Sequence, residues 1–204
     1  MIRVITTRQY LIGFSSRGVC DFVCPTTTIQ MNSQPIDQSP GDAGPEITSV
    51  TFRPAGPEDG AFLLELYAST RAEEMALVPW TDEQREAFVK MQFTAQQDHY
   101  RETYPNASRE IILSDGRPVG HRYVGRLEKE IRIVDITLAP AERNRGVGTF
   151  SLGELLNEGK RAGKLVRIFV ENYNPSLRLF ERLGFRQVEE HGVHLLMEWS
   201  ANSG

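Results

Sequence analysis

Two arginines and two glycines occupy a turn of the chain where their combination suits the binding of an anion. An apolar run at residues 131–138 predicts a buried strand, and leucines at helical spacing predict a helix beginning near Gly146. The turn between them carries Arg143, Arg145 and, at the helix start, Gly146 and Gly148. The first N–H groups of a helix have no partner within it, and the helix dipole adds positive charge there, so such an end binds phosphate well. Glycine lets a ligand approach the backbone. The alternative is an ordinary helix start with solvated arginines.

Asp135 is the carboxylate best placed for general acid–base chemistry. It interrupts the apolar run at residues 131–138, three residues before Leu138. A positioned carboxylate can take a proton from a reacting group, which is why we single it out as a candidate base. The alternative is a structural aspartate that accepts hydrogen bonds from a loop or from an arginine such as Arg71. Glu171 is a weaker candidate for the same role.

The overall composition excludes several classes of protein. The 204-residue chain is 40% hydrophobic and 25% charged, which is typical of a globular domain. Its formal net charge of −4 does not favour nucleic-acid binding, and no apolar run approaches the roughly 18 residues of a membrane span. Cys20 and Cys24 are the only cysteines and have no ligand-like partners nearby. We therefore expect no metal, no nucleic-acid partner, no membrane partner and a cytoplasmic location.

The N-terminal quarter differs in composition from the rest of the chain. Residues 26–46 are rich in Pro, Ser, Gln and Gly and hold too few apolar side chains to offset the entropy of ordering. We therefore expect a disordered extension over residues 1–46. A translation start at Met31 is an alternative, and the folded domain is expected to cover residues 47–204.

The folded part predicts an α+β architecture around a mostly antiparallel sheet. The expected strands cover residues 47–52, 111–113, 119–124, 131–138, 166–170 and 193–199, and the expected helices cover residues 57–69, 81–104, 146–161 and 175–183. Thr81 and Gln84 form a capping-box pattern, and Asp115-Gly116 is a strong signal for a hairpin turn. Gly163 is expected to end the third helix.

Two segments of the chain resemble a known family. The pattern Arg-x-x-Gly-x-Gly at residues 143–148, with Leu138-x-Pro140 before it, resembles the acyl-CoA-binding motif of the GNAT superfamily of N-acetyltransferases. VENYNPSLRLFERLGF, residues 170–185, is similar to its second cofactor segment, where Asn-Pro follows a strand and a helix ends in Leu-Gly-Phe. The resemblance spans roughly residues 47–199. It implies the GNAT (acyl-CoA N-acyltransferase) fold, with a twisted, mixed, mostly antiparallel sheet of about six to seven strands flanked by about four helices.

The resemblance also implies acetyl-CoA as the cosubstrate. The glycine-containing turn matches the family's pyrophosphate cradle, and Leu138 matches the strand position whose backbone pairs with the pantetheine arm as if the arm were an extra strand. Neighbouring strands splay at that point in the family. The residues implied to bind acetyl-CoA are Leu138, Ala139, Arg143, Asn144, Arg145, Gly146, Val147, Gly148, Thr149 and Asn174.

The implied reaction is direct transfer of the acetyl group to a primary amine of a small molecule. Asp135 is the expected base, and a backbone N–H near Leu138 or Ala139 is expected to stabilise the oxyanion. Many family members carry a tyrosine as general acid where this chain has Phe180, so Tyr173 is the alternative donor. Two other hypotheses remain open: a non-catalytic acyl-CoA-binding or sensor module, and acetylation of a protein amine.

The resemblance places the acceptor wall on the first two helices. An aromatic ring and a carboxylate suit an ammonium group, while an arginine suits a carboxylate, so an amino acid-like or polyfunctional amine is expected. The candidate acceptor-binding residues are Arg71, Glu74, Trp80, Gln96 and Tyr100. Exposed strand edges in this fold often pair between subunits, which makes a homodimer possible.

Overall fold

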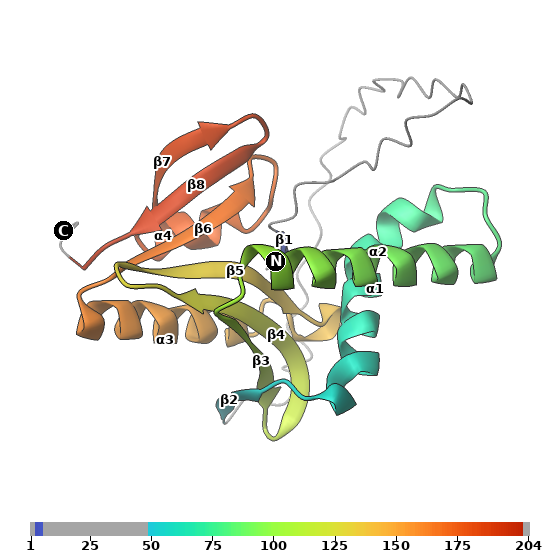
Figure 1. Cartoon of the computed structure of the whole chain (residues 1–204), viewed down its shortest axis with the longest axis horizontal. Coiled ribbons are helices and arrows are strands. Elements are labelled where there is room, and N and C mark those ends of the chain that lie inside the picture. The colour runs from blue at the N-terminus through green and yellow to red at the C-terminus, as the bar shows by residue number, and fades with distance from the viewer. Residues whose placement is uncertain (1–2, 6–48, 202–204) are drawn as a thin grey trace, which may run out of the picture. The chain divides into compact units, whose positions relative to one another are not determined.

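The computed structural model describes residues 3–5 and 49–201, which form one mixed sheet with helices on both faces (Figure 1). The sheet order is β2-β3-β4-β5-β6-β8-β7, and β1 pairs with β5 outside this path. The strands are β1 (Arg3–Ile5), β2 (Val50–Pro54), β3 (Ala107–Ser114), β4 (Arg117–Arg126), β5 (Glu130–Leu138), β6 (Leu165–Glu171), β7 (Arg186–His191) and β8 (His194–Trp199). All pairs are antiparallel except β5 and β6.

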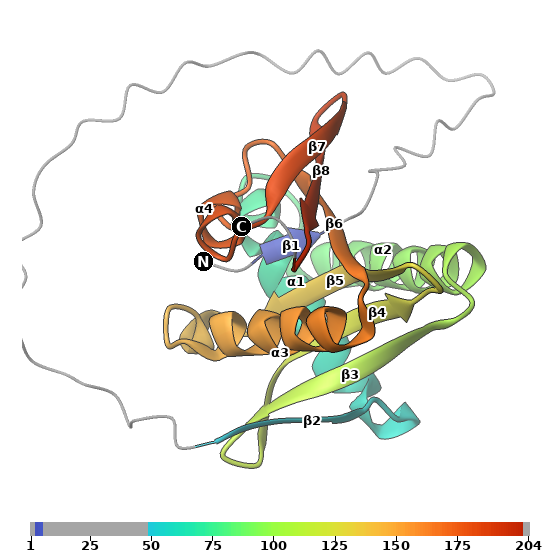
Figure 2. The ribbon, with the colours of Figure 1, turned by 90° about the vertical axis from the view of Figure 1, so that its left-hand side faces the viewer.

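The helices divide between the two faces of the sheet (Figure 2). They are α1 (Gly60–Ala76), α2 (Asp82–Thr103), α3 (Val147–Ala162) and α4 (Leu177–Arg182), with short 3-10 turns η1 (Pro57–Asp59) and η2 (Pro140–Glu142). Side chains of α3 and α4 enter the main core, where Leu152 and Phe180 meet Ile136 and Leu138 of β5. Helices α1 and α2 cover the other face. The expected GNAT-type fold is confirmed in its strands, helices and layers.

Local sequence signals explain why several elements begin and end where they do. Thr81 accepts a hydrogen bond from the N–H of Gln84, while the Gln84 side chain accepts one from the N–H of Thr81, so the predicted capping box opens α2. Asp115 and Gly116 have φ values of 49° and 77° in the β3–β4 turn, as the hairpin signal predicts. Gly163 ends α3 with a φ of 63°.

A bulge in β5 determines what its side chains face. Tyr123 pairs with Asp135 while Val124 pairs with Ile133, so Val134 is an extra residue in β5. An extra residue breaks the alternation of a strand and re-aims the side chains that follow. Beyond the bulge Ile136 lies in the core with α3, whereas Asp135 faces α1 and α2.

The strands β5 and β6 part just after this bulge. Their parallel pairing joins residues 130–133 to residues 165–168 and goes no further. The β5 edge at residues 135–137 is instead paired with β1 in an antiparallel register. Asp135 is thus positioned by the sequence where two neighbouring strands separate.

Two features differ from the sequence prediction. Strand β7 (Arg186–His191) was not predicted, because all six of its residues are exposed and it has no apolar face to give an alternating signal. Residues 3–5 form a short strand inside the segment expected to be disordered. The rest of the N-terminal extension to residue 46, with Met31, lies outside the described residues, so the predicted domain boundary stays a prediction.

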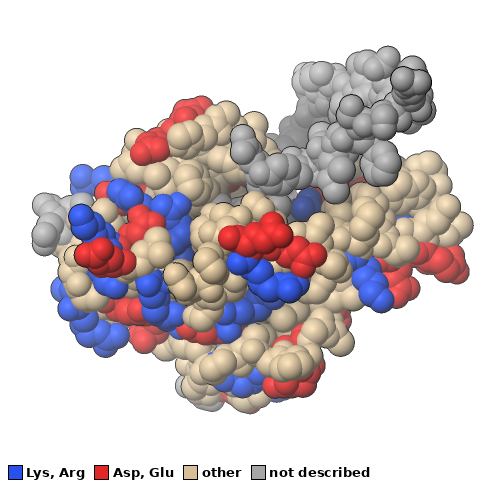
Figure 3. All heavy atoms as spheres, in the orientation of Figure 1, with Lys and Arg blue, Asp and Glu red and all other residues tan. Residues whose placement is uncertain are grey.

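Charged side chains of both signs intermix on the face shown in Figure 3. Some opposite charges of the described residues form ion pairs: Arg167 pairs with Glu130 and Glu198, and Arg132 pairs with Glu130. Within the described part of the chain, no helix has the length and apolar character needed to cross a bilayer. The same residues hold no group of three or more metal-ligating side chains.

Candidate active site

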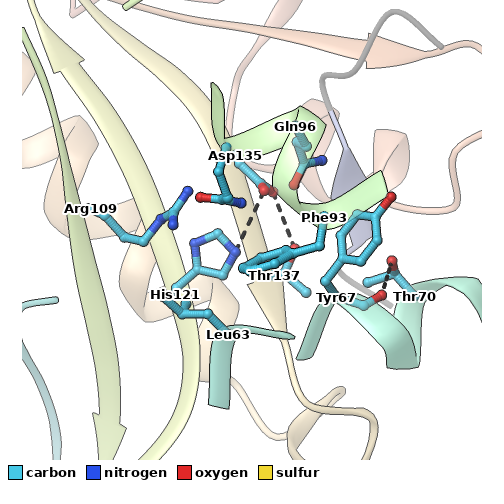
Figure 4. A pocket seen from close by; sticks show the side chains of 10 residues that line it. Leu63, Tyr67, Thr70, Phe93, Gln96, Arg109, His121, Asp135 and Thr137 are labelled. Carbon is cyan, nitrogen blue, oxygen red and sulfur yellow. Dashed lines mark hydrogen bonds and ion pairs between the residues drawn. The ribbon is translucent and has the colours of Figure 1, made fainter. Parts of the chain in front are cut away.

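A narrow pocket lies between the sheet and the two helices α1 and α2 (Figure 4). Its floor is formed by polar side chains of three neighbouring strands, and its roof is formed by the helices. Its free volume of about 10 Å³ is close to the room that one water needs. The residues that line it are Leu63, Tyr67, Thr70, Phe93, Gln96, Gln97, Arg109, His121, Asp135 and Thr137.

Asp135 is the buried acid of this pocket. It is 3% exposed, and its Oδ1 accepts a hydrogen bond of 3.2 Å from the Thr137 hydroxyl. Burial raises the pKa of the Asp135 carboxyl from 3.8 to about 7, against the opposing effects of the Arg109 charge and of hydrogen bonds from Thr137 and the Ile136 backbone. A carboxyl with a pKa near neutrality is suited to exchanging a proton at physiological pH.

His121 is a pocket residue that the sequence analysis did not single out. It lies on β4, opposite Thr137 of β5, and its Nε2 is 3.5 Å from Oδ2 of Asp135. Burial, assisted by the charge of Arg109, lowers the pKa of His121 to about 3, so the imidazole is neutral at pH 7. Its Nδ1 is buried and has no hydrogen-bond partner among the described residues. A single histidine within the apolar stretch of β4 was the available signal.

Arg109 is the second pocket residue that the sequence did not reveal. It pairs with Tyr123 across β3 and β4, and Tyr123 pairs with Asp135 across β4 and β5, so three side chains form a row across the sheet. The Arg109 guanidinium carbon lies 5.0 Å from the centre of the Tyr123 ring. Burial lowers the pKa of Arg109, and the charge of Asp135 acts in the opposite direction. This row depends on strand register, which a single sequence does not specify.

Of the five predicted acceptor residues, Gln96 lines the pocket. Arg71 is buried and paired with Glu74 at 3.1 Å, outside the lining. Trp80 packs edge-on against Phe88 with ring centres 5.0 Å apart, in the α1–α2 connection. Tyr100 is 1% exposed and stacks on Tyr123 in a small aromatic cluster.

The predicted phosphate-binding turn has the geometry of an open helix end. Gly146 is the N-cap of α3, with a φ of 87°, and as a glycine it has no side chain to cap the helix, whereas Thr81 caps α2. Val147 and Gly148 are buried, while Asn144 and Thr149 are exposed. Arg145 pairs with Glu142 at 3.3 Å. A helix that begins at a glycine has the kind of N-terminus at which backbone N–H groups bind anions.

Other predicted cofactor residues lie where β5 ends. Arg143 donates from Nε to the Leu138 carbonyl at 3.2 Å. The Ala139 N–H donates to the Val119 carbonyl at 2.8 Å, so it is already used within the protein. Asn174 is buried, and its Oδ1 accepts a hydrogen bond of 2.9 Å from the Ser176 N–H, which is ordinary turn geometry.

The two aromatic residues considered for the general-acid role differ in environment. Phe180 is fully buried and packs edge-on against Phe185 with ring centres 5.3 Å apart. Tyr173 is 66% exposed in the turn after β6. Only the phenol of Tyr173 carries a proton, and it lies beside Asn174 in sequence.

The buried carboxyl predicts a specific dependence of stability on pH. Asp135 has a folded-state pKa above its unfolded value, so its contribution to stability is full below about pH 4 and is lost as the pH rises to about 7. Asp135→Asn should therefore gain stability relative to wild type across this interval, by on the order of 3 kcal/mol. His121 has the opposite shift and partly masks the effect in the wild-type curve alone.

Urea unfolding of both proteins at pH 5 and pH 8 measures this gain. The difference in free energy of unfolding between the variant and wild type should be larger at pH 8. An equal difference at both pH values would show that the carboxyl titrates near its ordinary pKa.

Known proteins with a similar fold agree with this description of the structure. A model of the acetyltransferase (GNAT) family matches residues 66–185. The PaiA N-acetyltransferase of Thermoplasma acidophilum, solved in complex with coenzyme A, is 16% identical with a TM-score of 0.58, over 75% of this chain and 99% of that one. An acetyltransferase of Thermus thermophilus is 16% identical with a TM-score of 0.52, over 76% of this chain and 99% of that one.

A GNAT family acetyltransferase of Elizabethkingia anophelis with acetyl-CoA bound is 15% identical with a TM-score of 0.50, over 75% of this chain and 99% of that one. A search of curated proteins gives no significant match. At these identities the solved structures show a shared fold.

Proposed function

The chain belongs to the GNAT family of acetyltransferases, and from this premise we propose that it transfers an acetyl group from acetyl-CoA directly to the primary amine of a small molecule. The observation that carries the proposal is the position of Asp135. Its carboxyl is buried in a pocket at the point where β5 leaves β6, with a pKa raised to about 7. The pantetheine arm of acetyl-CoA, lying along β5, would meet the acceptor amine at this separation of the two strands, next to the base.

The residues around the start of α3 fit the phosphates of coenzyme A. The uncapped first turn of α3 offers N–H donors, Gly146 leaves open space beside them, and Arg143 and Arg145 add positive charge. We propose that this turn holds the pyrophosphate through Arg143, Asn144, Arg145, Gly146, Val147, Gly148 and Thr149. The pantetheine arm would lie along the β5 edge at Leu138 and Ala139, near Asn174, where β1 would have to yield.

The pocket residues would supply the proton chemistry. When bound, acetyl-CoA supplies a thioester carbonyl with a thiol leaving group. Asp135 accepts a proton from the acceptor amine, whose nitrogen bonds to the acetyl carbon as the carbon–sulfur bond breaks. The departing sulfur takes a proton, for which we propose the exposed phenol of Tyr173. The backbone N–H of Leu138 is the candidate oxyanion donor, since that of Ala139 is donated to Val119.

One observation favours a second function, binding of acyl-CoA without turnover. The position of the usual family tyrosine is taken by Phe180, which is buried in the core and has no proton to give. A thiol of ordinary pKa, about 8.5, still leaves without an extreme barrier, so we place this alternative second. Acetylation of a protein amine fits less well, because the pocket is narrow and covered by α1 and α2. The predicted homodimer and cytoplasmic location stay predictions.

Binding and turnover of acetyl-CoA by the full chain test the proposal. Calorimetric titration should give a dissociation constant on the order of 1–100 μM, and addition of a mixed pool of primary amines should release coenzyme A, measured as free thiol. Binding without release for any amine would support the sensor function. The absence of binding would contradict both functions.

A further inference from the structure

Arg109 is partly buried, and its electrostatic partners differ from those of the buried arginines Arg71 and Arg122. Arg122 pairs with Glu110 at 2.6 Å, and Arg71 pairs with Glu74 at 3.1 Å. Arg109 makes no ion pair with any carboxylate of the described residues, and its Nε is buried without a hydrogen-bond partner. Within the described part of the chain, its guanidinium lies over the face of the Tyr123 ring.

A guanidinium in this position is costly to the free protein. Removing a cation from water without a hydrogen-bonding anion costs free energy, which the ring face of Tyr123 offsets only in part. Asp135 acts on Arg109 electrostatically from across the pocket, but its oxygens are within reach of Thr137 and His121, and no hydrogen bond joins it to Arg109. The pocket therefore offers an entering anion a guanidinium that no carboxylate of the described residues pairs with.

We infer that the acceptor carries a carboxylate beside its amine, as an α-amino acid does, and that Arg109 binds this carboxylate. The inference rests on the proposed acetyl transfer, because it identifies the class of the acceptor. A planar guanidinium binds a carboxylate through two parallel hydrogen bonds, which fixes orientation as well as position.

The register of the sheet brings the two recognition groups to the same pocket. Arg109 and Asp135 occupy one row across three strands, and both side chains reach the same pocket (Figure 4). Their backbones lie two strand spacings apart, about 10 Å, and the long arginine side chain spans part of this distance. The amine and carboxylate of an α-amino acid are separated by one carbon atom, so one end meets Arg109 while the other meets Asp135.

The remaining pocket residues agree with a small polar acceptor. Gln96, Gln97 and Thr70 offer neutral polar groups from the helices, and His121 is neutral beside Asp135. The small free volume means that an acceptor enters only when side chains of α1 and α2 give way. Arg71, which the sequence suggested for a carboxylate, is already paired with Glu74 and lies outside the lining.

Two matched pools of acceptors test this inference on the full chain. One pool contains the protein α-amino acids except cysteine, whose thiol would disturb the assay, and the other contains their α-carboxamides. With saturating acetyl-CoA, thiol release should be at least about tenfold faster with the acids. The α-amine of a carboxamide is less basic and intrinsically more available, so chemistry without recognition would favour the amides.

The variant Arg109→Gln should reduce the ratio of acid to amide rates to about one, and the matched control Arg101→Gln should keep the wild-type ratio. Arg101 is an exposed arginine of α2 paired with Asp98. An amide pool as fast as the acid pool in wild type, or a preference that survives Arg109→Gln, would overturn the inference. If Arg109→Gln does not fold, the ratio of acid to amide rates in the wild-type protein tests the inference by itself.

A second readout separates this inference from the proposed function. Thermal shift with coenzyme A and each pool measures acceptor binding without transfer. Carboxylate recognition is supported if the acids stabilise the protein more than the amides do and this difference disappears in Arg109→Gln. If this result is found but neither pool releases thiol, only the acetyltransferase proposal fails. No difference between the pools in either assay overturns the inference.

Discussion

Asp135→Asn is expected to lower kcat for acetyl transfer about a hundredfold or more while leaving the affinity for acetyl-CoA within about twofold of wild type. The amide has nearly the shape of the carboxyl but cannot accept a proton from the amine. The side chain at position 135 faces the pocket under α1 and α2, whereas the proposed phosphate-binding turn lies at the start of α3. The contacts with the cofactor should therefore persist in Asp135→Asn. Thiol release and calorimetric titration measure the two quantities.

The pH dependence of the wild-type rate should identify the same group. Because a base must be ionised to accept a proton, kcat/KM should rise with pH and level off above about pH 7, the pKa of Asp135. His121 is neutral around pH 7, because its pKa is lowered to about 3. The rise through pH 7 should be absent from the residual activity of Asp135→Asn.

The loss of activity in Asp135→Asn should coincide with a gain in stability relative to wild type at pH 8. A structural aspartate would behave differently, since its replacement would lower both stability and activity. Turnover equal to wild type would remove Asp135 from the mechanism. A loss of activity together with a loss of cofactor affinity would point instead to a distorted β5.

Elements with strong local signals were predictable from the sequence. The capping box of Thr81 and Gln84, the Asp115-Gly116 turn and the glycine that ends α3 act through contacts between residues close in the chain. The strand β5 is buried on both faces over most of its length, so its nearly continuous apolar run predicted it without knowledge of its neighbours. In β6 buried and half-buried residues alternate, and this alternation is itself a local strand signal.

The composition of the pocket depends on long-range register, which explains why only part of it was predicted. Asp135 was noticed because it interrupts an apolar run, but Arg109, which lines the same pocket, lies 26 residues earlier in the chain. Arg109 reaches it through two strand pairings and the bulge at Val134. The same bulge sets which side chains face α1 and α2. A single sequence carries no signal for the exact residue at which a bulge occurs.

A substitution in the turn before α3 is expected to have a large effect on the affinity for coenzyme A. The glycine of this turn, Gly146, has a left-handed backbone conformation and empty space around it. Gly146 has a φ of 87°, and a Cβ built on it meets no atom within 4 Å. A side chain there would be strained and would occupy the space in front of the first-turn N–H groups. Gly163 at the other end of α3 has a φ of 63° and is equally open, which makes it a matched control.

Gly146→Val is expected to raise the dissociation constant for coenzyme A about a hundredfold, equivalent to about 2.7 kcal/mol. Gly163→Val should lose a comparable amount of stability, at least about 1–2 kcal/mol for a β-branched residue in the left-handed region, yet bind coenzyme A as wild type does. Calorimetric titration and urea unfolding of the three proteins separate the two effects. If both variants lose affinity equally, strain in α3 explains the loss. If neither does, the phosphates bind elsewhere, and the assignment of this turn as the cradle is wrong.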